Sequence, residues 1–96
     1  MLSIVEETRV SDALHDACLK WPRADEAWDA VTWALMRDPT VGRPLIEGGA
    51  LRLTIWAGAK SIGMPDIRIT YRITEVSIEI LDAVFTESTH TAAGSA

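Results

Sequence analysis

Three arginines occupy polar positions in the second half of the chain, within stretches where apolar and polar residues alternate. Arg52 lies in one stretch where apolar and polar residues alternate, and Arg68 and Arg72 lie in the next. Because successive side chains of a strand point to opposite faces of a sheet, this spacing predicts the three guanidinium groups on one face. Guanidinium groups bind phosphate oxygens through paired hydrogen bonds, and Thr54 and Trp56 add a hydroxyl group and a stacking ring to that predicted face. The pattern favours a surface that binds an RNA backbone.

A second interpretation of this face needs no ligand. An antiparallel sheet with one solvated face generally carries polar side chains on that face. Glu79 and Asp66 could form surface ion pairs with the arginines, and such pairs contribute little to stability. The net charge of −5 over 96 residues agrees with this interpretation, because proteins that grip nucleic acid are normally basic.

Other kinds of chemistry lack the residues they need. The single cysteine, Cys18, excludes an internal disulfide and a cysteine-based zinc cluster, and His15 and His90 are too far apart to predict a metal site. The glycines lack the spacing of a phosphate-binding loop. We expect no metal, no cofactor and no membrane contact, and we expect a cytoplasmic location because no secretory signal is evident.

Two helices are predicted ahead of the arginine-bearing strands. Residues 1–5 are short and partly β-branched, which indicates an edge strand. A helix is predicted from Ser11, because apolar residues recur at positions 10, 14, 18 and 21. A second helix spans Ala24–Arg37 and ends at Asp38, which precedes a proline. The short link at residues 21–23 makes the two a helical hairpin.

After a turn-rich segment at residues 38–49, the period of the apolar residues changes from 3.6 to 2. Alternation over residues 51–56, 66–73 and 76–81 predicts three strands joined as an antiparallel meander. On the first of these strands, the predicted core face carries Leu51, Leu53 and Ile55. The predicted fold is α+β, with the helical hairpin packed on one face of an antiparallel sheet of 3–4 strands. Residues 1–86 form a single domain, and residues 87–96 are predicted to be a flexible tail.

Four local phrases, taken in this order, carry a resemblance to a known family. They are RDPTVGRPL at residues 37–45, LRL at residues 51–53, IRITYRI at residues 67–73 and VSIEIL at residues 76–81. With the order of strand, helical hairpin and meander, they resemble the RelE/ParE family of toxins from type II toxin–antitoxin systems. The resemblance implies an endoribonuclease that cuts messenger RNA on the ribosome, with Arg68 and Arg52 as the catalytic cations and Arg72, Trp56 and Thr54 as RNA-binding residues. It also implies an antitoxin partner, through which any contact with DNA would be made.

The sequence departs from the ribonuclease members of that family at three places, one of which is the long loop Gly58–Pro65 where the family has a short hairpin. Thr54 stands where a second basic residue is usual, and neither arginine nor tyrosine follows the last strand. His90 could supply a proton only if the tail folds back. Two alternatives therefore stay open. One is a ParE-like inhibitor of DNA gyrase that acts by protein–protein contact. The other is a catalytically silent module for interaction or homodimer formation, for which exposed Trp33, Trp56 and Met64 would be suited.

Overall fold

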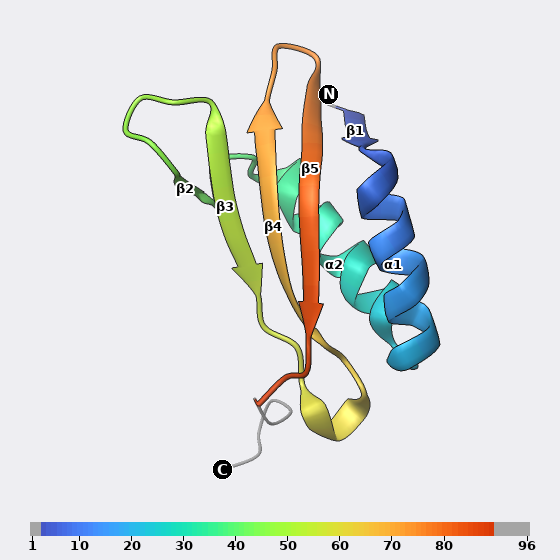
Figure 1. Cartoon of the computed structure of the whole chain (residues 1–96). Coiled ribbons are helices and arrows are strands. Elements are labelled where there is room, and N and C mark those ends of the chain that lie inside the picture. Colours follow the sequence, from blue (N-terminus) through green and yellow to red (C-terminus); the bar gives the residue numbers. More distant parts are fainter. Residues whose placement is uncertain (1–2, 90–96) are drawn as a thin grey trace.

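The computed structural model describes residues 3–89 and has an α+β architecture. Two helices lie on one side of a five-stranded sheet whose strand order is β1-β5-β4-β3-β2 (Figure 1). The elements along the chain are β1 (Ser3–Glu6), α1 (Thr8–Lys20), α2 (Ala24–Arg37), β2 (Arg43–Pro44), β3 (Leu51–Trp56), the 3-10 turn η1 (Lys60–Ile62), β4 (Asp66–Ile73) and β5 (Ser77–Thr86).

The helical hairpin is confirmed. α2 buries its predicted stripe, whereas Cys18, which belongs to the apolar stripe predicted for α1, is exposed. α2 buries Ala27, Trp28, Val31 and Leu35 in the core, as the spacing of its apolar residues predicts. Asp25 and Glu26 in its first turn and Arg37 in its last complement the helix dipole. α1 begins at Thr8, three residues before the predicted start, and buries Val10 and Ala17. α1 packs mainly on β5, so the helix layer covers the β5 side of the sheet more fully than the β3 side.

The predicted meander is confirmed, but the sheet has five strands and is mixed, whereas an antiparallel sheet of 3–4 strands was expected. β3, β4 and β5 pair antiparallel in chain order. β1 joins the outside of β5 and runs parallel to it, from Ser3 opposite Ser77 to Glu6 opposite Ile80. β2 pairs only Arg43 and Pro44 with β3. The sequence missed β2 because two residues show no alternation, and alternation within a strand says nothing about its neighbour's direction.

The predicted faces of β3 are wrong. Directly opposed residues of paired strands share a face, and here Arg52 is opposite Tyr71 while Trp56 is opposite Ile67. Tyr71 and Ile67 are fully buried beneath the helices, so Arg52 and Trp56 point to the helix side. Leu53 is opposite Thr70 and therefore points away from the helices. A shift of one residue in the pairing register exchanges the two faces of a strand. β3 lies at the less covered end of the sheet, where polar side chains are tolerated on the helix side, so the alternation of β3 did not determine which face is buried.

Candidate functional site

The sheet surface opposite the helices is the candidate site, and we call it the open face. The register assigns side chains to it from every long strand, because residues that alternate with the buried core positions must point outward. The open face comprises Val5 from β1, Arg43 from β2, Leu51, Leu53 and Ile55 from β3, Arg68, Thr70 and Arg72 from β4, and Glu79, Asp82 and Val84 from β5.

Apolar side chains make up much of the open face. Ile55 is 64% exposed and Val5 is 50% exposed, and Leu51 is exposed as well. A hollow of about 210 Å³ beside Ile55 is lined by Val41, Arg43, Leu53 and Thr54. Leu51, Leu53 and Ile55 form one apolar strip along β3, whereas Glu79 and Arg72 separate Val5 from it. A contiguous apolar strip with polar residues around it is typical of a protein–protein contact.

The two predicted arginines of β4 lie on the open face in different electrostatic states. Arg72 is opposite Glu79 on β5, and its Nε donates to the Glu79 Oε1 atom at 2.8 Å. A second bond runs from Arg72 Nη2 to the same oxygen, so this guanidinium is neutralised by its neighbour. Arg68 is exposed between Ile55 and Val84, and within residues 3–89 its guanidinium forms no ion pair. Arg68 is therefore the predicted cation that remains able to bind a partner.

The other predicted site residues lie on the helix side of the sheet. Arg52 Nη1 donates to the carbonyl oxygen of Gly42 at 2.7 Å and to that of Thr40 at 3.3 Å. Trp56 is half-buried and packs against the core, and Thr54 is half-buried beside it. The structure thus brings Arg68 and Arg72 together on one face and separates them from Arg52, Thr54 and Trp56 on the other. The predicted convergence of Arg52 with Arg68 is wrong, because β3 presents the opposite face.

Arg52 and Arg68 should differ in their effect on stability. Arg52→Ala removes a charged donor from the half-buried carbonyl of Gly42, which should lower the free energy of unfolding by about 1–2 kcal/mol. Arg68→Ala removes an exposed side chain and should change it by less than about 0.5 kcal/mol. Urea titration of the two variants beside the wild type measures the difference. Equal stability of the two variants would contradict the assigned role of Arg52.

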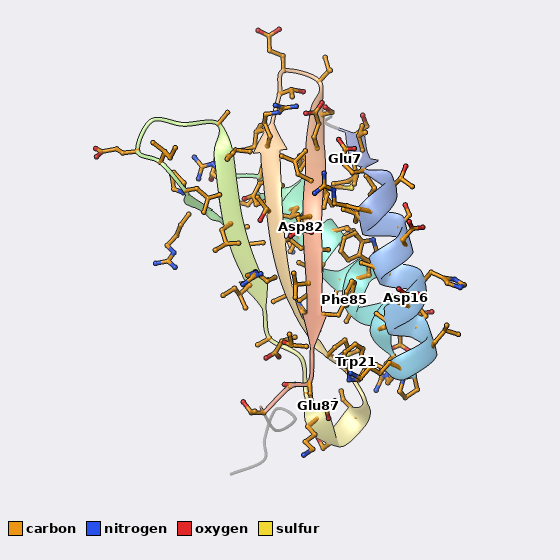
Figure 2. All side chains as sticks on the ribbon, in the orientation of Figure 1. Glu7, Asp16, Trp21, Asp82, Phe85 and Glu87 are labelled. Carbon is orange, nitrogen blue, oxygen red and sulfur yellow. The ribbon has the colours of Figure 1, made fainter. Side chains whose placement is uncertain are left out.

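A second feature, a groove between α1 and β5, gave no signal in the sequence. Its volume is about 340 Å³, and it is lined by Ala13, Asp16, Ala17, Lys20, Trp21, Ala83, Val84 and Phe85. Figure 2 shows Asp16, Trp21 and Phe85 around the end of α1, with Glu87 just beyond β5. β1 pairs with β5 only as far as Ile80, which leaves this side of the later β5 residues without a neighbouring strand among residues 3–89. The lining residues come from positions 13–21 and 83–85, which are far apart in the chain, so no local pattern could reveal the groove.

The start of the predicted tail packs against the domain. Glu87 Oε2 accepts a hydrogen bond from the Trp21 indole nitrogen at 2.8 Å, and Ser88 is only 1% exposed. The predicted flexible tail of residues 87–96 therefore begins with two residues that are held in place. The candidate proton donor His90 lies outside the described residues.

Of the residues expected to be exposed, Trp33 is 61% exposed on α2, with the Arg37 guanidinium 4.8 Å from its ring centre. Trp56 and Met64 are only half-exposed.

Within residues 3–89, no cluster of histidine, cysteine, aspartate or glutamate could hold a metal ion. Neither described helix is long and apolar enough to cross a membrane.

Comparison with known proteins adds no relative. No protein-family model matches the chain, and no curated protein is significantly similar to it in sequence.

Proposed function

We propose that this chain is a RelE/ParE-like protein of a toxin–antitoxin system that acts by protein–protein contact through the open face. The observation that carries the proposal is the exposed apolar surface of β3, with Ile55 and Leu51, beside Arg68, which has no ion-pair partner in the described part of the chain. An apolar strand flanked by Arg43 and Arg68, which have no ion-pair partner among residues 3–89, is the composition of a protein contact surface, in which arginine is enriched. The order of strand, helical hairpin and meander supports the family assignment.

Contact with protein explains the arrangement of the arginines better than cleavage of RNA. Phosphodiester cleavage by positioning and charge stabilisation needs several cations that converge on one phosphate. Arg52 points to the helix side and Arg72 is paired with Glu79. Among residues 3–89, Arg68 is therefore the only one of the three predicted cations that lies on the open face without an ion-pair partner. The net charge of −5 also disfavours binding to the negatively charged RNA backbone. In this proposal the target is a protein such as gyrase, and an antitoxin segment covers the open face until it is released.

A ribosome-dependent endoribonuclease, or a weakened descendant of one, is the second candidate. Arg68 favours it, since an exposed arginine without an ion-pair partner among residues 3–89 can still bind a phosphate bidentately. The two candidates differ in what they require of Ile55. Protein contact needs its apolar side chain, whereas RNA cleavage depends on Arg68.

Induced expression separates the candidates. We expect growth arrest with the wild type, relief by Ile55→Asp, and unchanged arrest with Leu19→Asp, which places the same charge on a 78%-exposed leucine of α1. Circular dichroism checks that all three proteins are folded. Purified wild type should inhibit gyrase supercoiling and should not cut messenger RNA in a translation extract.

Two results would overturn this proposal. Ribosome-dependent cleavage that disappears in Arg68→Ala would establish the endoribonuclease in its place. Arrest that persists in folded Ile55→Asp would show that the open face is not the contact surface.

A further inference from the structure

We propose that a second copy of this chain covers the open face when no other partner is bound, so that the resting form is a two-fold dimer with its sheets stacked face to face. This inference rests on the proposed use of the open face for protein contact, and it names the occupant of that face in the resting protein.

The charges of the open face are arranged so that two copies are complementary. The side chains without an ion-pair partner within residues 3–89 are basic on one half of the face, with Arg43 on β2 and Arg68 on β4. They are acidic on the other half, where Asp82 on β5 is opposite Thr70 (Figure 2). Arg68 and Asp82 lie only two positions apart along neighbouring strands. A two-fold interface joins a surface to itself, so it needs both signs of charge on one face.

The strand order fixes which elements would meet. The sheet runs β1-β5-β4-β3-β2, so a two-fold axis parallel to the strands and between β5 and β4 places β4 of each copy over β5 of the other. Arg68 of one copy then lies over the stretch of β5 that carries Asp82 in the second copy. The same operation places β3 over β1, which brings Leu51 of one copy to Val5 of the other because these residues lie at the same level of the sheet. Charge meets opposite charge, and apolar side chains meet apolar side chains.

The size of the face indicates a weak dimer. Only β1, β5, β4 and β3 of each copy overlap in this arrangement, because β2 lies beyond β1 of the other copy. Four strands about 4.8 Å apart and about 20 Å long give a face of roughly 380 Å² in projection. The two copies together therefore bury about 800 Å², which is the size of a weak, transient contact. We expect a dissociation constant in the micromolar range, so that another partner of the same face can displace the second copy by mass action.

Sedimentation equilibrium between about 1 and 100 μM tests the inference. The wild type should shift from monomer to dimer over this range. Arg68→Glu and Asp82→Arg should each raise the dissociation constant about tenfold, and the double variant should recover most of that loss because the opposite charges meet again. Leu51→Asp should be monomeric throughout, because Leu51 lies over Val5 of the other copy. Leu19→Asp, outside the open face, should behave as the wild type.

Each contrary result has a defined meaning. A folded wild type that stays monomeric over the whole range overturns the inference, and so does a dimer that Leu51→Asp leaves intact. A double variant no tighter than the single variants overturns the contact between Arg68 and Asp82. Growth arrest by a monomeric wild type would retain the proposed function and reject the dimer. A dimer without arrest or gyrase inhibition would retain the dimer and reject the proposed function.

Discussion

Gly58→Ala is expected to destabilise the fold by about 3 kcal/mol or more, the largest effect of any single methyl group that we predict. Gly58 is buried where the chain leaves β3, and its backbone nitrogen donates to Asp66 Oδ1 at 2.7 Å. A β-carbon at this position would overlap the backbone carbonyl oxygens of Met64 and Pro65. Carbonyl oxygens of the main chain cannot rotate away as a side chain can, so the loop itself must move.

The loop behind Gly58 has little freedom to accommodate that movement. Ala59 and Met64 form a bridge between its two arms, with hydrogen bonds of 3.0 and 3.1 Å between their backbones. Pro65 is fully buried at the start of β4. Separating the arms to admit a methyl group would break the bridge and displace β4, which is central in the sheet.

Thermal unfolding followed by circular dichroism measures the effect. We expect the midpoint for Gly58→Ala to fall by at least about 10 °C. Gly48→Ala is the matched control, since nothing lies within 4 Å of its β-carbon position and only its φ of 76° carries a cost, of about 1 kcal/mol. If both variants unfold at the same temperature, the close approach at Gly58 is not what requires glycine.

Tyr71→Phe is expected to lower the free energy of unfolding by about 2–3 kcal/mol. The Tyr71 hydroxyl donates to the carbonyl oxygen of Pro39 at 2.7 Å and accepts from the backbone nitrogen of Gly42 at 2.9 Å. It thereby ties the segment after α2 to β4. Phenylalanine would leave a buried N–H group and a carbonyl oxygen without these bonds while adding no space for water, which is the costly way to lose a hydrogen bond.

The segment that Tyr71 holds is also closed to larger residues. A β-carbon at Gly42 would lie 2.6 Å from the Tyr71 hydroxyl oxygen and 2.8 Å from the carbonyl oxygen of Leu53. Urea unfolding of Tyr71→Phe beside Thr32→Val isolates the bridging role. Thr32 also loses a hydroxyl, but its bond to the Trp28 carbonyl oxygen lies within α2. A loss no greater than that of Thr32→Val would contradict the bridge.

Stability should fall in strong alkali because of the same side chain. Burial raises the pKa of Tyr71 above its ordinary value of 10.0, and the Gly42 N–H opposes this only in part. Above pH 10 the unfolded chain releases this proton while the folded protein still holds it, so the free energy of unfolding decreases as pH rises. Tyr71→Phe should reduce that slope. Wild-type and variant unfolding curves at pH 8 and above pH 10 make the comparison, and parallel slopes would contradict the assignment.

The periods of the sequence determined which elements form. A stripe repeating every three or four residues requires a helix to bury it, and Asp38 before Pro39 had to end the second helix. Alternation likewise determined β4, because its isoleucines and Tyr71 all face one densely packed helix layer. These inferences rest on neighbours in the chain, where local stereochemistry and burial agree.

Tertiary structure alone decided which faces meet. The same alternation on β3 did not reveal which side faces the helices, because the side chains on both faces of β3 are partly exposed to solvent at the less covered end of the sheet. The pairing register of β3 with β4 determines which side chains of β3 face the helices. It places the Arg52 guanidinium against the Gly42 carbonyl oxygen and leaves Arg68 exposed. Two other interactions also depend on the tertiary structure. Arg72 pairs with Glu79 because β4 and β5 are neighbours, and Trp21 donates to Glu87 because the chain after β5 lies beside the end of α1. Alternation measures the direction of a side chain relative to its own strand, whereas a functional surface depends on the strands and helices that the rest of the chain places beside it.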